Sequence, residues 1–141
     1  MKGRFTVINK KPLFIVDGAH NAGAADKMAE SIRHYFNGKK LIYIMGVFAD
    51  KEYKIVLEKT AHFAEKIYTI ETPDNPRALP AEELAKAARV YNSSAESTKS
   101  IKDAVEKAFS CAGDDENSVI LAFGSLSFIG ALTDAVEEYV G

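Results

Sequence analysis

Short apolar runs alternate with longer amphipathic stretches along the chain. The four most apolar runs show no regular polar alternation, which is typical of strands that are buried on both faces. These runs are Leu13–Val16, Lys40–Met45, 66–70 and 119–123. Two weaker segments complete the predicted strands: residues 5–8, which we expect to end at a break over 10–12, and residues 93–96.

Between these strands lie stretches in which apolar residues recur at helical spacing. In the first of them, Ala25, Met28, Ile32 and Tyr35 fall on one stripe. The predicted helices cover 21–36, 51–64, 81–91, 100–111 and 126–140. Strands separated by helices of this length form βαβ units, so the pattern predicts an α/β fold. We expect a three-layer, Rossmann-like arrangement with a mostly parallel sheet and helices on both faces.

Composition and charge exclude several classes of function but leave the predicted fold unchanged. With 141 residues, 47% of them apolar, the chain is long enough for a single domain spanning 1–141. It carries 18 basic and 20 acidic residues, a net charge of −2, so we expect no nucleic-acid partner. The single cysteine excludes an intramolecular disulfide framework. The longest apolar runs fall far short of the ~20 residues of a membrane helix, so we expect a cytoplasmic protein without a membrane partner.

Polar residues with chemical potential follow the four apolar strands directly. Ligands of open α/β sheets bind beyond the carboxyl ends of the strands, and the turns there are 17–21, 46–51, 72–77 and 124–125. We expect these four turns to share one edge of the sheet. Together they supply carboxylates, an imidazole, cations and hydroxyls. Each turn also has a purely structural interpretation as a turn or helix cap, which the sequence leaves open.

Several familiar site types do not fit these turns. Residues 18–23 have the glycine spacing of a phosphate-binding P-loop, but Ala24 and Ala25 stand where Lys and Ser or Thr are required. No G-x-G-x-x-G fingerprint of dinucleotide binding occurs. Residues 124–128 lack the G-x-S-x-G pattern of a hydrolase nucleophile, which disfavours a catalytic triad. No metal ligand is assigned on this chain.

Five short motifs in order carry a resemblance to a known family. They are Gly3-Arg4-Phe5, Asp17-Gly18-Ala19-His20-Asn21, Ala49-Asp50-Lys51, Pro76-Arg77-Ala78 and Gly124-Ser125-Leu126. In this order and spacing the chain resembles the C-terminal domain of folylpolyglutamate synthase/dihydrofolate synthase, which belongs to the Mur ligases. The sequence departs from the family pattern at Ala22, where proline is frequent, and at Ser127, where tyrosine is frequent.

The resemblance implies an ATP-dependent ligase that adds L-glutamate to folates through an acyl-phosphate intermediate. It also implies that the P-loop ATPase domain precedes this domain and is absent from this chain, and that it holds the Mg²⁺ ligands and most of the folate site. The partners implied are that N-terminal domain, ATP, L-glutamate and the folate substrate. The isolated domain is then expected to be inactive as a ligase.

The resemblance also implies roles for individual residues, although it assigns none as catalytic. Arg4 and Asp17 are expected to bind ATP, at the phosphates and the ribose respectively. The residues expected to bind glutamate are His20, Ser125, Arg77 and Asn75. Asn21 and Asp50 are expected to support these groups at helix starts.

Two other functions stay open on the sequence. One is a free-standing, non-catalytic module that uses the same turns to hold a nucleotide or an amino acid. The other is the C-terminal domain of a cell-wall Mur ligase, because residues 74–77 read Asp-Asn-Pro-Arg and resemble the loop that selects diaminopimelate or lysine there.

Overall fold

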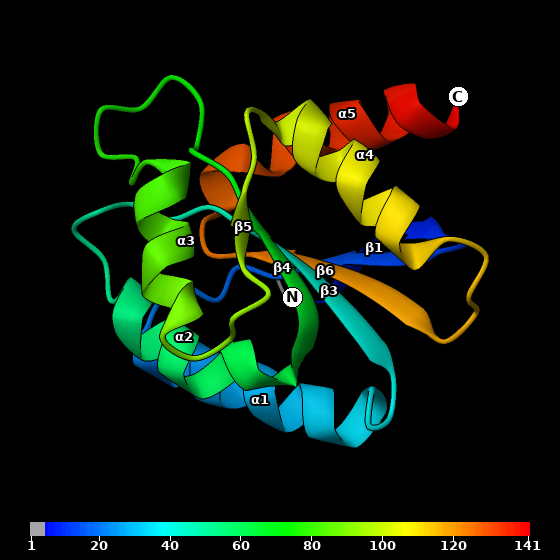
Figure 1. Cartoon of the computed structure of the whole chain (residues 1–141), viewed down its shortest axis with the longest axis horizontal. Coiled ribbons are helices and arrows are strands. Elements are labelled where there is room, and N and C mark those ends of the chain that lie inside the picture. The colour runs from blue at the N-terminus through cyan, green and yellow to red at the C-terminus, as the bar shows by residue number, and fades with distance from the viewer. Residues whose placement is uncertain (1–4) are drawn as a thin grey trace.

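The computed structural model describes residues 5–141 and has a six-stranded sheet at its centre (Figure 1). The sheet has the order β1-β2-β6-β3-β4-β5, and every neighbouring pair is parallel except β1 with β2. The strands are β1 (Thr6–Lys10), β2 (Leu13–Val16), β3 (Lys40–Met45), β4 (Ala64–Thr69), β5 (Glu96–Ser97) and β6 (Ser118–Phe123). The predicted mostly parallel sheet is therefore confirmed.

Helices cover both faces of this sheet, as the strand composition predicts. The helices are α1 (Ala22–Tyr35), α2 (Tyr53–Thr60), α3 (Ala81–Arg89), α4 (Ile101–Ala112) and α5 (Ile129–Val140). Buried residues of α1, α2 and α3 pack on one face with Leu41, Tyr43 and Met45. Buried residues of α4 and α5 pack on the other face with Ile42 and Ile44 (Figure 1). Because successive strand residues point to opposite faces, β3 is apolar on both of them from Leu41 to Met45.

The element boundaries differ from the prediction in a few places. β1 continues to Lys10, which pairs with Leu13, because only residues 11 and 12 form the hairpin turn that returns the chain antiparallel along β2. The second helix ends at Thr60, where the Tyr43 hydroxyl donates to the Thr60 carbonyl at 2.7 Å, and β4 begins already at Ala64. Tyr35, which belongs to the predicted apolar stripe, lies at the last turn of α1 and is 65% exposed, so this end of the stripe is not buried.

The short edge strand and the last helix also differ slightly from the prediction. β5 covers Glu96–Ser97 rather than 93–96. The last predicted helix divides into a 3₁₀ turn over Leu126–Phe128 and α5. No helix within residues 5–141 is long and apolar enough to cross a membrane.

Two glycines bring the ends of the central strands β3 and β6 into contact. Gly124 follows β6 with a φ of +114°, and a Cβ atom there would lie 2.4 Å from the carbonyl oxygen of Gly46. It would also lie 2.9 Å from Cγ1 of Val47. Glycine is therefore required at position 124, both because φ is positive and because a side chain would collide with its neighbours. The close approach places the turn after β6 directly beside the turn after β3.

We predict that Gly124→Ala destabilises the domain by about 1–3 kcal/mol, because the added methyl group collides with backbone and φ is positive. The matched control is Gly130→Ala, since Gly130 lies in α5 with nothing within 4 Å of its added Cβ. There alanine should stabilise by up to about 1 kcal/mol. Urea unfolding of both variants measures the difference, and equal effects would contradict the packing argument.

Candidate functional site

A cavity of about 260 Å³ lies at the carboxyl edge of the sheet. It brings together three of the residues that the sequence predicts for ligand binding: His20 after β2, Arg77 in the loop after β4, and Ser125 after β6. The remaining lining residues are Phe48, Lys51, Gly124, Leu126 and Ser127. The parallel pairing of β2, β6, β3 and β4 explains this meeting, because it aligns their carboxyl ends.

The turn between β2 and α1 positions His20, because side-chain hydrogen bonds of Asp17 and Asn21 hold the backbone on either side of it. Asp17 is 5% exposed, and its carboxylate accepts the N–H of Ala19 at 2.8 Å. Asn21 is the N-cap of α1, and its side chain accepts the N–H of Ala24 at 2.9 Å. His20 is exposed, and its ring Nδ1 lies 2.8 Å from the carbonyl oxygen of Gly18. The capping role of Asn21 and the cavity position of His20 therefore coexist in one turn.

Ser125 lies at the start of the 3₁₀ turn that follows β6. Its hydroxyl oxygen accepts the N–H of Ser127 at 3.1 Å and lies 2.7 Å from the Ser127 hydroxyl. Ser125 is 6% exposed, so little of this side chain is open to the cavity. The paired hydroxyls can both donate to and accept from a ligand.

Arg77 is held against Asp50 and Phe48. Its Nε lies 3.2 Å and its Nη2 lies 3.0 Å from the same Asp50 oxygen, and Nη2 also donates to the other carboxylate oxygen at 3.1 Å. The guanidinium carbon lies 4.5 Å from the centre of the Phe48 ring. Asp50 thus occupies one edge of the guanidinium group. Among the described residues no hydrogen bond engages Nη1, which remains available for a ligand carboxylate.

Backbone pairing between two loops brings Asp50 to Arg77. Phe48 and Ala78 form an isolated antiparallel bridge, and the N–H of Ala49 donates to the Arg77 carbonyl at 2.7 Å. The Asn75 side chain accepts the N–H of Arg77 at 2.9 Å, which shapes this loop. Asn75 itself does not line the cavity. Arg4 lies outside the described residues.

Sequence reasoning assigned no role to four of the lining residues. Phe48 and Leu126 contribute apolar surface to the cavity, and Leu126 is 52% exposed. Lys51 adds a second cation, and Ser127 adds the second hydroxyl. All four lie inside or directly beside the turns named from the sequence, so their position was the available signal. Nothing in the sequence pattern separates them from ordinary loop residues.

The site combines cationic and apolar side chains. Within residues 5–141 no group of three or more His, Cys, Asp or Glu side chains could hold a metal ion. Lys51 and Arg77 can bind a carboxylate, and the apolar side chains of Phe48 and Leu126 can contact a short aliphatic segment. The arrangement can therefore hold a small amphipathic acid.

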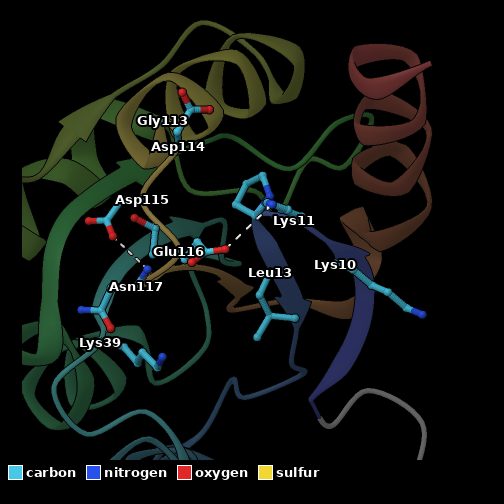
Figure 2. Close-up of a pocket in the computed structure, with 11 residues that line it drawn as sticks. Lys10, Lys11, Leu13, Lys39, Gly113, Asp114, Asp115, Glu116 and Asn117 are labelled. Carbon is cyan, nitrogen blue, oxygen red and sulfur yellow. Dashed lines mark hydrogen bonds and ion pairs between the residues drawn. The ribbon is translucent and has the colours of Figure 1, made fainter.

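A larger cavity of about 1020 Å³ lies at the opposite edge of the sheet, where β2 and β6 begin (Figure 2). Its lining mixes Lys10, Lys11 and Lys39 with the acidic residues 114–116, and Lys11 pairs with Glu116 at 3.9 Å. The opposite charges largely compensate each other. None of the predicted site residues lies there, so we place the candidate site at the carboxyl edge.

The chain is similar to known proteins over most of its length. Residues 3–126 match the family model described as "Mur ligase, glutamate ligase domain". The dihydrofolate synthase/folylpolyglutamate synthase of Bacillus subtilis is 28% identical over 127 residues, which are 90% of this chain and 28% of that protein. The Buchnera aphidicola protein of the same name is 30% identical over 130 residues, which are 89% of this chain and 29% of that protein.

Solved structures agree with the fold. The folylpolyglutamate synthase of Thermotoga maritima superimposes with a TM-score of 0.77 at 27% identity, over 96% of this chain and 30% of that one. E. coli FolC in complex with ADP superimposes with a TM-score of 0.85 at 21% identity, over 99% of this chain and 32% of that one. The chain therefore spans less than a third of the length of these relatives.

The ion pair of Arg77 with Asp50 allows a prediction about the pKa of the Asp50 carboxyl. The Arg77 hydrogen bond holds the pKa of the Asp50 carboxyl below its usual range. The ion pair therefore stabilises the loop fully at pH values above the ordinary pKa of an aspartate. This stabilisation is lost as the pH falls through the lowered pKa of Asp50. Arg77→Gln should raise the Asp50 pKa toward its usual range, whereas Arg33→Gln, a distant control, should not. Carboxyl NMR titration checks both, and added salt should weaken the shift because the pair is exposed.

Proposed function

Because this chain belongs to the glutamate ligase domain family of the Mur ligases, we propose that it is the glutamate-binding part of an ATP-dependent ligase that adds L-glutamate to folates. The convergence of His20, Arg77 and Ser125 on one small cavity carries this proposal. The names of the relatives support the folate branch over the cell-wall branch. The full enzyme is proposed to act in the cytoplasm.

The size and chemistry of the cavity favour the amino acid as its occupant. A volume of about 260 Å³ is small beside the roughly 300–1,000 Å³ of pockets for drug-sized ligands. An amino acid fits this space better than a nucleotide or a folate does. Glutamate carries two carboxylates for Arg77 and Lys51, and two side-chain methylenes for the apolar surfaces of Phe48 and Leu126.

The proposed reaction explains why the site lies at an exposed edge. A folate carboxylate takes the γ-phosphoryl group of ATP and becomes an acyl phosphate, which the amine of glutamate then attacks. Water would hydrolyse the acyl phosphate, so a second domain that closes over this edge protects it. We propose that the ATP-binding domain closes here, and that it carries the ligands for Mg²⁺ and most of the folate site.

Individual roles follow from this arrangement as parts of the same proposal. Asp17 would accept hydrogen bonds from the ribose of ATP, and Arg4 would contact its phosphates. Arg77 would bind a glutamate carboxylate through the guanidinium edge that Asp50 leaves open. Ser125 and His20 would orient the rest of the amino acid. Among solved relatives, one synthase is described with Mn, AMPPNP and L-glutamate bound, which fits these ligand classes.

The test uses the full-length ligase of which this chain would be the C-terminal part. A hydrogen bond to a charged ligand contributes about 1.5–3 kcal/mol, so Ser125→Ala should raise KM for glutamate at least about tenfold. KM for ATP should change less than about twofold, whereas Asp17→Asn should raise KM for ATP more than KM for glutamate. Phosphate release that depends on folate and glutamate is the measurement.

Ser110→Ala is the matched control for this test, because Ser110 is an exposed serine of α4 that does not line the cavity. It should leave both KM values unchanged. Glutamate-independent turnover, or equal effects of Ser125→Ala on both substrates, would overturn the assignment. Binding of a nucleotide or an amino acid without any ligase activity in the full-length protein would favour a non-catalytic module.

A further inference from the structure

The hydrogen bond between the His20 ring and the Gly18 carbonyl determines what His20 can do for a ligand. A carbonyl oxygen only accepts hydrogen bonds, so Nδ1, 2.8 Å from it, must carry the proton. A neutral imidazole carries a single N–H, and its other nitrogen, Nε2, then presents a lone pair. The turn therefore selects the tautomer of His20 that has an acceptor on the side of the ring away from Gly18.

This acceptor differs in kind from the cationic groups of the cavity. Within residues 5–141 no hydrogen bond or ion pair engages Nε2. Lys51 and Arg77 can only donate. Ser125 and Ser127 can accept, but their hydroxyls already bond to each other and cannot take up a proton near neutral pH. Among the side chains that line the cavity, His20 is the one that can bind an ammonium group and then accept its proton.

We propose that His20 is the general base that deprotonates the amino group of the incoming amino acid, and this rests on the proposed function. An amino acid arrives as an ammonium ion, whose nitrogen has no lone pair with which to attack. Its carboxylates would lie toward Arg77 and Lys51, which turns the ammonium group toward Nε2 of His20. The hydrogen-bond donors Arg77 and Lys51 and the acceptor His20 would thus bind opposite ends of the amino acid and orient it.

The step balances in atoms and charge. The ammonium transfers one proton to Nε2 of His20, and the resulting amine forms a C–N bond with the carbonyl carbon of the acyl phosphate. The tetrahedral adduct expels phosphate as its C–O bond breaks, and the second proton of the nitrogen leaves with that phosphate. The imidazolium then releases its proton to solvent, so the products are the amide, hydrogen phosphate and one proton.

The variants His20→Gln and His20→Asn test whether His20 must accept a proton or need only orient the substrate by hydrogen bonding. In His20→Gln the amide oxygen can still accept a hydrogen bond from the ammonium near the place of Nε2, but it cannot take up a proton. In His20→Asn the amide can still donate to the Gly18 carbonyl, but it leaves the place of Nε2 empty. Both side chains are polar replacements at an exposed position, so the core is untouched.

In the full-length ligase, both variants should lower kcat at pH 7 at least about 100-fold, which is the lower range for loss of a general base. KM for glutamate should change only a few-fold in His20→Gln. Its rate should then rise steadily with pH, because solution hydroxide supplies the free amine. The other charged groups at the cavity are Lys51 and Arg77 with its partner Asp50. Wild-type kcat with an unchanged pH profile in His20→Gln would overturn the proposal.

Hydroxylamine separates this proposal from the proposed function. It is neutral at pH 7 and traps acyl phosphates as hydroxamates without a base. Wild type, His20→Gln and His20→Asn should all form the ATP- and folate-dependent hydroxamate at rates within about threefold of each other. Loss of hydroxamate in the two variants alone would show that His20 acts before amine attack and would overturn the base assignment. Absence of hydroxamate in wild type as well would overturn the proposed ligase function.

Discussion

Parallel pairing of β6 with both β2 and β3 is the constraint on which the site depends. The register ends with Val16 opposite Ala122 on one side and Met45 opposite Phe123 on the other. The backbone bonds continue one step further, since the N–H of Asp17 donates to the Ala122 carbonyl and that of Gly46 to the Phe123 carbonyl. Three turns therefore start at almost the same level.

Close packing of these turns follows from the absence of a side chain at Gly124. The turn after β6 passes so near to Gly46 that any Cβ atom would collide with backbone. The small cavity of about 260 Å³ lies at this same edge, and Gly124 is one of its lining residues.

Local bonding inside each turn prepares the functional groups. Each turn contains a side chain that bonds to backbone two or three residues away: Asp17 to Ala19, Asn21 to Ala24, Asn75 to Arg77 and Ser125 to Ser127. Such bonds are those of ordinary turns and caps. They also hold His20 and Arg77 in place, because both lie within these turns. The structural and the functional interpretations of these segments are therefore compatible.

The apolar pattern of the sequence determined the layers, the helix and strand types and the shared edge, because burial on both faces leaves a direct signature in residue type. It also indicated that the turns containing His20, Arg77 and Ser125 share one edge, since ligands of such sheets bind at strand ends, whereas the family resemblance singled out these three residues. Only the tertiary structure decided that Asp50 reaches Arg77, 27 positions away, across the Phe48 ring, and that Nδ1 of His20 faces a carbonyl. These are matters of atomic distance and direction between loops. They depend on how separate turns pack, which residue types and spacing along one chain do not encode.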